Sequence, residues 1–305
     1  MPDYTVNLHK QFNFPLDILR NYIYERTGIK FRGFKKITDG IECEVYNIGR
    51  YIVKIRRKGE VPFDCIKWAV DKCKLHGIKV PDIVYCGRIS DTAADFDIII
   101  EETVQGSPAA PELYEQAGAE LRKIHNIKVG GFWKMYEPGK FCIDINDGKI
   151  DVSDDYNNSL RGVIKYFRDE NIYGRAEINY IERLLCEYLN LKISPVLCHG
   201  DYHPRHILGG KRLNGIIDWG DFQGGSGYVD LVNFQMYSNS NTNSNSDTGH
   251  FGRFFKGYGE IDEKEFLLNK VHTILWEIIE NGDESEIKIK KAYERELLNA
   301  IKPNN

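Results

Sequence analysis

The sequence predicts an α+β fold with two lobes, one built on a small antiparallel sheet and one mainly helical. Segments of alternating and β-branched residues fill the stretch 34–102 and enclose one amphipathic helix. Long amphipathic stretches dominate after residue 106, and 305 residues suit about two domains or lobes at roughly 150 residues each. We therefore place a small lobe at residues 1–105 and a helical lobe at residues 106–305.

The first lobe begins with a helix and continues as strands around a second helix. Apolar residues at helical spacing predict the first helix at 15–27, and Gly28 follows as a stop signal. Alternation and tight turns then predict strands, another amphipathic segment predicts a helix, and two more strands close the lobe. These elements are expected at 34–38, 41–48, 49–57, 64–76 (the helix), 79–89 and 96–102.

The second lobe contains two strongly amphipathic stretches, at 111–127 and 160–189. The residues between them, 127–158, are rich in Gly, Lys and Asp, and we expect loops there. The polar low-complexity run 238–249 cannot bury a core, so we expect a mobile surface insertion and not a lid. A linker between domains is the alternative interpretation, but the residues that follow have the pattern of helices that complete the same lobe.

Composition excludes several classes of function. The net charge of −4 gives no basic field for nucleic acid or an anionic membrane surface, and no apolar segment is long enough to span a bilayer. The first residues contain no hydrophobic signal segment, so we expect a cytoplasmic protein, monomeric or a small homo-oligomer. The seven cysteines are odd in number, scattered and without a C-x-x-C pair, which predicts reduced thiols and no cysteine zinc site.

The segment 196–230 concentrates residues that carry chemistry. Its pattern is strand, polar loop, strand, turn and a strand that ends in a carboxylate. This order brings Asp201, His206 and Asp218 to one mouth of a small hairpin. A carboxylate and an imidazole can hold Mg²⁺ with phosphate oxygens and waters, while a second carboxylate accepts a proton from a hydroxyl.

The pattern H-G-D-x-x-x-x-H followed by I-I-D-W-x-D resembles the catalytic and metal loops of the aminoglycoside phosphotransferase family, a branch of the protein-kinase-like fold. Further matches occur in the expected order over about residues 30–260. They are the strand that reaches Lys54, the turn at 77–81, the segment 98–106 that would join the lobes, and the helix end at 120–125.

The resemblance implies that residues 1–105 form a nucleotide-binding lobe with a hinge at its end, and that residues 106–305 form a helical lobe with the catalytic and metal loops. It also implies roles for individual residues. Asp201 matches the aspartate that orients and deprotonates the acceptor hydroxyl, and Asp218 matches the aspartate that chelates Mg²⁺ at the nucleotide phosphates. His206 stands where many members have asparagine as the second metal ligand, although histidine also occurs there. Lys54 matches the lysine that contacts the α and β phosphates. Its acidic partner has no unambiguous counterpart, and we expect Asp64 first and Glu60 second.

The resemblance also implies contacts for the nucleotide base and the acceptor. Glu102 and Val104 would offer a backbone carbonyl and amide to the adenine edge, and the turn 38–43 around Gly40 would cover the phosphates with backbone amides. Asp221, Glu277 and Glu280 are candidates for binding a polycationic acceptor, although an ordinary solvated acidic face also explains the last two.

Some residues of the same segment have simpler expected roles. We expect His199 to orient the backbone, His203 to be exposed on its loop, Trp219 to lie in the core, and Asp230 to cap a helix.

The resemblance therefore predicts a phosphotransferase that moves the γ-phosphoryl group of ATP or GTP, with Mg²⁺, to a hydroxyl of a small molecule, first an aminoglycoside-type antibiotic. A kinase of a small metabolite alcohol (choline-, homoserine- or sugar-like) or of a macrolide would use the same residues. Two other classes stay open: a Zn²⁺ metallohydrolase built on His199, Asp201, His203 and His206, and a nucleotide-binding protein without catalysis.

Overall fold

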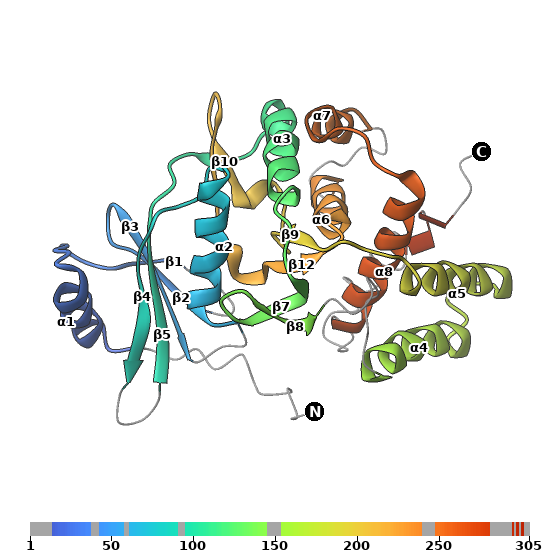
Figure 1. The fold of residues 1–305 in the computed structure, drawn as a ribbon, viewed down its shortest axis with the longest axis horizontal. Helices are drawn as coiled ribbons and strands as arrows, with labels where there is room; N and C mark the ends of the chain where they lie inside the picture. Colours follow the sequence, from blue (N-terminus) through green and yellow to red (C-terminus); the bar gives the residue numbers. More distant parts are fainter. Residues whose placement is uncertain are drawn as a thin grey trace.

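The computed structural model describes residues 14–37, 43–57, 61–90, 95–144, 154–239 and 248–280, together with residues 295, 297, 298, 300 and 301. A lobe built on one twisted sheet lies beside a larger lobe rich in helices (Figure 1). The predicted α+β fold with two lobes is confirmed.

The small lobe is a five-stranded antiparallel sheet in the order β1-β2-β3-β5-β4, with one helix before it and one inserted between β3 and β4. The bounds are α1 (Leu16–Thr27), β1 (Lys35–Ile37), β2 (Glu44–Asn47), β3 (Tyr51–Arg57), α2 (Phe63–Leu75), β4 (Ile83–Ser90) and β5 (Asp95–Glu102). Each element falls within a residue or a few of its predicted range.

Alternation along β5 separates the two faces of this sheet. Ile98 and Ile100 pack with α1 in one hydrophobic cluster, whereas Ile99 packs on the opposite face in the cluster that contains α2. All three side chains are buried, which explains the apolar run. The cross-strand partner of Ile99 is Lys54 on β3, so Lys54 belongs to the face that looks toward the second lobe.

The second lobe begins directly after residues 103–106. Its elements are β6 (Ser107–Pro108), η1 (Pro111–Leu113), α3 (Tyr114–His125), β7 (Gly131–Glu137), β8 (Lys140–Asp144), α4 (Asp154–Asp169), α5 (Arg175–Leu189), β9 (Val196–Cys198), η2 (Pro204–His206), β10 (Ile207–Gly209), β11 (Leu213–Ile216), η3 (Trp219–Asp221), β12 (Gln223–Gly225), α6 (Tyr228–Asn239), α7 (Thr248–Tyr258) and α8 (Glu263–Glu280). Two small sheets, β11-β10-β6 and β8-β7-β12-β9, hold the segment between β9 and β12.

The prediction of loops at 127–158 is wrong for most of that stretch. β7 and β8 form an antiparallel hairpin there, and α4 begins at Asp154. The hairpin folds because Phe132, Met135 and Phe141 are buried, which its Gly and Lys content hides in the sequence. Of the predicted polar loop 238–249, α6 runs through Asn239 and α7 begins at Thr248, and the remainder lies outside the described residues.

The central hydrophobic cluster joins the two lobes. It contains residues of α2 together with residues of α3, β7, β9, β10, β11, α6 and α7, so α2 is part of the core that supports the segment 196–230. A second cluster packs α4, α5 and α8 against each other at the far end of the large lobe (Figure 1). Helices α3 and α7 approach closely because Gly118 and Gly257 face backbone atoms of the opposite helix, where a Cβ would overlap them.

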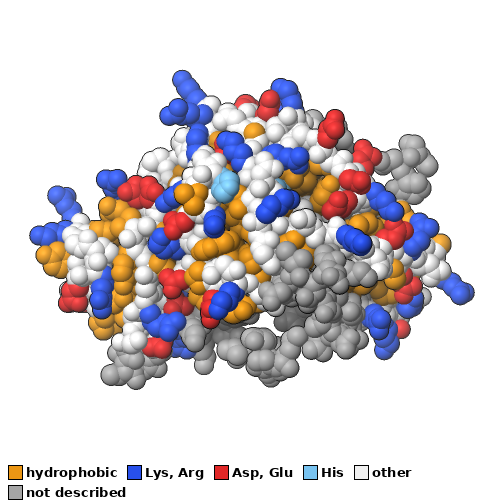
Figure 2. All heavy atoms as spheres, in the orientation of Figure 1, with side chains coloured by type: hydrophobic (Ala, Val, Ile, Leu, Met, Phe, Trp, Pro, Cys, Tyr) orange, Lys and Arg blue, Asp and Glu red, His pale blue; other side chains and the backbone are white. Residues whose placement is uncertain are grey.

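The surface and the cysteines agree with the composition. Basic and acidic side chains are interspersed over the face shown in Figure 2. All seven cysteines are free thiols. Among the described residues, no helix combines the length and the apolar character needed to cross a membrane.

Candidate active site

Three predicted residues meet at the end of the β10–β11 hairpin. His206 ends η2, Asp201 precedes η2, and Asp218 follows β11. His206 Nδ1 lies 3.3 Å from Asp201 Oδ2, and His206 Nε2 lies 3.5 Å from Asp218 Oδ2. The predicted convergence of Asp201, His206 and Asp218 is present in the structure.

Hydrogen-bond partners allow the tautomer of each histidine in this segment to be assigned. His206 Nδ1 lies 3.0 Å from the Asp201 carbonyl oxygen, which can only accept, so Nδ1 carries the proton. Nε2 of His206 is then an unprotonated lone pair, and it faces Asp218. Burial lowers the pKa of His206 from its usual value of 6.5, and this keeps the ring neutral.

His199 and His203 carry their proton on Nε2, which is the tautomer opposite to that of His206. His199 Nε2 donates to the Ile217 carbonyl oxygen at 2.9 Å, and its Nδ1 accepts the Asp201 amide at 3.3 Å. His199 is buried, and its backbone-orienting role agrees with these contacts.

His203 was expected to be exposed, and this is wrong. Only 6% of its surface is accessible because the ring packs on His206 and Tyr237. Its Nδ1 accepts the Arg205 amide, so Nε2–H points at Asp201 Oδ1, 3.4 Å away. A polar loop sequence gives no local signal of this burial.

These tautomers weaken the metallohydrolase alternative. Both ring nitrogens of His199 are occupied by backbone groups, and Nε2 of His203 carries the proton that faces Asp201. Of the three histidines, only His206 presents a ring nitrogen lone pair that accepts no hydrogen bond within this segment.

The backbone has unusual conformations near Asp201 and Asp218. Asp218 has a left-handed backbone (φ 64°, ψ 67°), which is uncommon for a residue other than glycine and concentrates at functional positions. Gly200, with φ +86°, passes so close to the Asp221 carbonyl that any Cβ would collide with it. The His199–Gly200–Asp201 turn and the Asp218 turn are therefore held against each other by backbone contact.

Lys54 comes into the site from the small lobe. Its Nζ lies 3.2 Å from Asp218 Oδ1 and 3.3 Å from Glu101 Oε1. Asp64 was predicted as its acidic partner, and the structure corrects this: Asp64 is exposed in the first turn of α2 and bonds to Cys86. Glu101 is the acidic partner of Lys54 because it lies on β5, two residues from Ile99, on the sheet face that carries Lys54. Glu60, the second choice, lies outside the described residues.

Electrostatics keeps the two aspartates ionised. The Lys54 ammonium holds the pKa of Asp218 well below its usual range. Burial alone would raise the pKa of Asp201, but the hydrogen bond from His203 and the neighbouring imidazoles outweigh it and lower the pKa. For Lys54, burial opposes the charge, while Glu101 and Asp218 more than compensate and raise its pKa.

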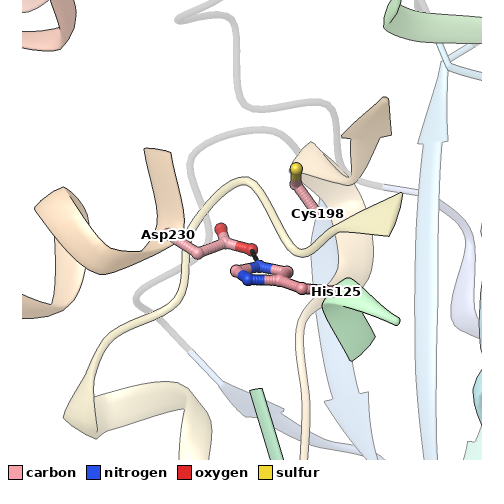
Figure 3. Close-up of side chains that lie close together, drawn as sticks. All are labelled: His125, Cys198 and Asp230. Atoms are coloured by element: carbon pink, nitrogen blue, oxygen red, sulfur yellow. Dashed lines mark hydrogen bonds and ion pairs between the residues drawn. The ribbon is translucent and has the colours of Figure 1, made fainter. Parts of the chain in front are cut away.

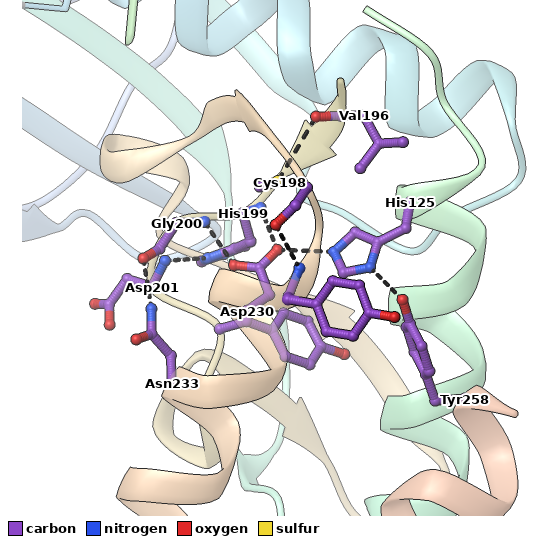
Figure 4. A network of polar contacts seen from close by, with 12 residues as sticks. His125, Val196, Cys198, His199, Gly200, Asp201, Asp230, Asn233 and Tyr258 are labelled. Atoms are coloured by element: carbon purple, nitrogen blue, oxygen red, sulfur yellow. Dashed lines mark hydrogen bonds and ion pairs between the residues drawn. The ribbon is translucent and has the colours of Figure 1, made fainter. Parts of the chain in front are cut away.

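Asp230 organises the backbone of the loop that follows β9. One carboxylate oxygen, Oδ2, accepts the His199 amide at 2.7 Å and lies 3.0 Å from His125 Nε2, and Oδ1 accepts the Gly200 amide at 2.8 Å. His125 contacts the Tyr258 hydroxyl at 2.8 Å through its other nitrogen. Figure 4 shows how side chains from α3, α6 and α7 meet at this loop.

The expected role of Asp230 as a helix cap is therefore incomplete. It lies in the first turn of α6, but its carboxylate serves the loop after β9. Cys198 lies beside His125 and Asp230 (Figure 3). Burial raises the pKa of its thiol well above the usual value, and both nitrogens of His125 have partners, so these three side chains form a structural cluster.

The segment between the lobes contains Glu102 and Val104, which the resemblance assigns to the base edge. The Glu102 amide donates to the Asp82 carbonyl, and its carboxylate pairs with Arg50. Within the described part of the chain, the Val104 amide donates to no carbonyl, so it is available to a base edge. Gly40 and most of the turn 38–43 lie outside the described residues.

Two of the three predicted acceptor carboxylates have described side chains. Asp221 in η3 lies 3.5 Å from Lys134 on β7. Trp133 of β7 packs edge-on against Trp276 of α8, the residue before the half-buried Glu277. Nothing is described of the Glu280 side chain. Trp219 lies in the core as expected, with 2% of its surface accessible.

The donor set suits a divalent cation. A hard carboxylate oxygen and a neutral imidazole nitrogen face each other at 3.5 Å, a separation that two ligands of one ion can span at about 2.1 Å each. Phosphate oxygens and waters would complete the coordination.

Comparison with known proteins gives a family and a fold. A model of the phosphotransferase enzyme family matches residues 34–265. No curated protein matches the sequence in a direct comparison.

Several solved structures share the fold over almost the whole chain. A thermostable mutant of aminoglycoside phosphotransferase APH(4)-Ia is 12% identical with a TM-score of 0.64, covering 92% of this chain and 97% of its own. Spectinomycin phosphotransferase APH(9)-Ia, in complex with ADP and spectinomycin, is 16% identical with a TM-score of 0.61, covering 95% of both chains. Amicoumacin kinase hAmiN, in complex with AMP-PNP and Ca²⁺, is 16% identical with a TM-score of 0.65, covering 95% of this chain and 94% of its own.

The family match spans both the Lys54 strand and the Asp201–Asp218 segment, and the kinase-like fold extends beyond it in both directions. The chain is a member of the phosphotransferase enzyme family.

Proposed function

We propose that this phosphotransferase moves the γ-phosphoryl group of ATP or GTP to a hydroxyl of a small molecule. The observation that carries the proposal is the meeting of Lys54 from the small lobe with Asp201, His206 and Asp218 from the large lobe. Asp201 would be the base, Asp218 and His206 the metal ligands, and the Lys54 ammonium the phosphate-binding group, and all four side chains lie together.

In this proposal Asp201 accepts the proton of the acceptor hydroxyl. The hydroxyl oxygen forms a bond to the γ-phosphorus, the bond from that phosphorus to the β–γ bridging oxygen breaks, and the nucleoside diphosphate leaves. The lowered pKa of Asp201 keeps it ionised, and the His203 Nε2–H holds one of its oxygens in place.

Asp218 and His206 would hold Mg²⁺, and Lys54 would contact the α and β phosphates. When bound, the ion offsets negative charge on the triphosphate oxygens. Glu101 on β5 also pairs with Lys54, so the ammonium keeps a carboxylate partner within the small lobe when phosphates approach. The Val104 amide would bind the base edge.

The acceptor we propose is an antibiotic of the aminoglycoside type. Structural neighbours bind hygromycin B, spectinomycin, streptomycin or gentamicin, and the exposed Asp221 carboxylate, three residues after Asp218, can pair with an ammonium group as it does with Lys134. A small metabolite alcohol or a macrolide is the alternative acceptor.

The test is a panel of acceptors with ATP and with GTP in the presence of Mg²⁺, read by mass spectrometry of the phosphorylated product. The panel holds the four antibiotics named above, a macrolide, choline, homoserine and a simple sugar. Phosphorylation of an aminoglycoside alone supports the proposal, whereas transfer only to another class reassigns the acceptor. Nucleotide hydrolysis without any phosphorylated acceptor would reject phosphotransfer to these hydroxyls.

Asp201→Asn tests the assignment of the base. It should lower kcat by about 10²-fold to 10⁴-fold and leave nucleotide affinity unchanged, because Asp201 acts on the acceptor. Asp17→Asn is the matched control, since Asp17 is an exposed aspartate on α1, away from the site. A mutant that keeps more than about a tenth of kcat contradicts the assignment.

A further inference from the structure

We propose that Trp133 of β7 is a specificity-determining residue, and that the face of its indole ring binds an acceptor ring that carries ammonium groups. The inference rests on the proposed function, because it concerns the acceptor of the same site. It assigns the recognition of that acceptor to an aromatic face beside a carboxylate, a contact that Asp201, His206 and Asp218 do not supply.

The backbone of Trp133 has a conformation that a bulky residue rarely adopts. Its φ is +71°, and among the described residues other than glycine only Asn171 and Asp218 also have a positive φ. Asparagine and aspartate tolerate the left-handed region, whereas a large aromatic residue there is an outlier. Such conformations cost free energy and cluster at functional sites. An indole that is kept at this position despite the cost points to a role for the ring itself.

Trp133 lies in a β-bulge that keeps two neighbouring side chains out of the core. Between Phe132 and Met135, β7 advances three residues while β8 advances two, so β7 contains one extra residue. Phe132 and Met135 are both buried, whereas Trp133 and Lys134 between them are only half-buried. A regular strand would send one of the two middle side chains into the core. The bulge therefore presents Trp133 and Lys134 together.

Lys134 connects this bulge to the loop that carries the proposed base. Its Nζ lies 3.5 Å from Asp221 Oδ1. The Asp221 carbonyl packs against Gly200, the residue before Asp201. Both side chains of the ion pair are partly exposed, so the pair contributes little stability and an acceptor ammonium can replace Lys134 at Asp221. The bulge thus lies next to the loop of Asp201.

The Trp133 ring occupies the neighbouring position. The hairpin of β7 and β8 lies between α2 and α8 (Figure 1), and Trp133 meets Trp276 of α8 with 5.5 Å between ring centroids and an interplanar angle of 88°. A perpendicular contact covers at most one face of either ring. An indole face is the strongest aromatic partner for a cation, and it also packs against the CH groups of a saturated ring. A ring bound there can pair an ammonium group with Asp221 and offer a hydroxyl to Asp201.

The first test measures binding and needs no turnover. The chain has tryptophans at positions 68, 133, 219 and 276, so protein labelled with 5-fluorotryptophan gives four fluorine NMR signals. Trp133→Phe identifies the signal of Trp133, because it removes that signal and keeps an aromatic ring. Hygromycin B, spectinomycin, streptomycin and gentamicin are added in turn. At least one of them should shift the Trp133 signal and leave the signal of Trp219, which lies in the core, unchanged.

The second test separates recognition from a structural role. Trp133→Asn removes the ring and keeps the backbone, because asparagine adopts the left-handed region. It should raise the KM of the acceptor by about tenfold and change kcat and the KM of the nucleotide by less than about twofold. Trp133→Phe should recover most of the acceptor affinity. A structural role would instead lower Tm and kcat together.

Tyr136→Asn is the matched control, since it removes an exposed aromatic ring from the same strand. It should leave the KM of the acceptor unchanged. If Trp133→Asn does not fold, the fluorine signal and the kinetics of Trp133→Leu decide in its place, with the same expected rise in KM.

The outcomes distinguish this inference from the proposed function. The role of Trp133 is overturned if none of the four compounds shifts its signal, or if the KM of the acceptor is unchanged when the indole is removed, even in an enzyme that phosphorylates an aminoglycoside. A shift of the Trp133 signal in a protein that phosphorylates no member of the acceptor panel supports the binding role and rejects the proposed phosphotransfer.

Discussion

Replacing Asp230 by alanine removes the acceptor of three buried donors at once. The His199 and Gly200 amides and the His125 ring lie 2.7, 2.8 and 3.0 Å from its oxygens, and Asp230 is fully buried. Each donor left unpaired costs about 1–3 kcal/mol, so the lower bound for three is about 3 kcal/mol. A folded domain has about 5–15 kcal/mol of stability in total, so Asp230→Ala consumes a large part of it.

The assay is thermal unfolding followed by circular dichroism, with kinetics on the same samples. At about 2–4 °C per kcal/mol for a chain of this size class, Asp230→Ala should lower Tm by about 6–12 °C. Asp230→Asn keeps one acceptor oxygen and the same shape, so its loss should be about 1–3 kcal/mol. Because the two amides belong to the loop that carries Asp201, both variants should lower kcat more than they raise the KM for nucleotide.

Asp17→Asn is again the control, because it also replaces an aspartate in the first turn of a helix. It removes only the interaction with the helix dipole, about 0.3–1 kcal/mol. If Asp230→Ala melts within about 2 °C of the wild type, the three hydrogen bonds do not hold the loop and the reasoning fails.

Three further predictions concern the site and the core. The kcat/KM should be constant from about pH 8 to about pH 6.5 and fall only below that range. Burial lowers the pKa of His206 and the Lys54 ammonium lowers the pKa of Asp218, so both side chains stay unprotonated over this range. An acid limb of the profile centred above about pH 7 would refute this prediction. If the acceptor is an aminoglycoside, its KM should rise with ionic strength, while the KM of a neutral alcohol stays constant. The reason is that salt screens ion pairs at exposed carboxylates such as Asp221, with a screening length of about 8 Å at physiological salt. Equal salt dependence for both acceptors would count against charge pairing. Gly118→Ala should destabilise the protein by about 1–3 kcal/mol, because the added Cβ overlaps the Phe254 carbonyl of α7. Gly162→Ala on α4 has open space for the Cβ and should stabilise the protein by about 1 kcal/mol. Equal Tm values for the two variants would contradict the close approach of α3 and α7.

The convergence of the site residues in the segment 196–230 could be predicted because these residues are close together in the sequence. Asp201, His206 and Asp218 lie within one strand–turn–strand unit, so the turn signals and the apolar strands place them at one end. The small lobe was predictable for the same reason, since each strand pairs with a strand close to it in sequence.

Residues that act through distant contacts could not be found in this way. Glu101 reaches Lys54 only when β3 and β5 pair with Ile99 opposite Lys54, and the adjacent Glu102 has the same local pattern. The pairing of the two predicted strands was the one signal that could have favoured Glu101. Asp230 on α6 and His125 on α3 are distant in sequence from the loop that they contact. The burial of His203 depends on Tyr237 near the end of α6.

The small lobe is attached to the β10–β11 hairpin at two separate places. The Ile216 amide donates to the Lys79 carbonyl at 2.9 Å, and the Asn214 side chain donates to the Gln105 carbonyl at 2.7 Å. The same lobe is also held by an apolar surface, because α2 packs into the cluster that contains β10 and β11. Polar contacts at β11 and apolar contacts through α2 therefore fix the small lobe together, and the 3.2 Å between Lys54 and Asp218 follows from that packing.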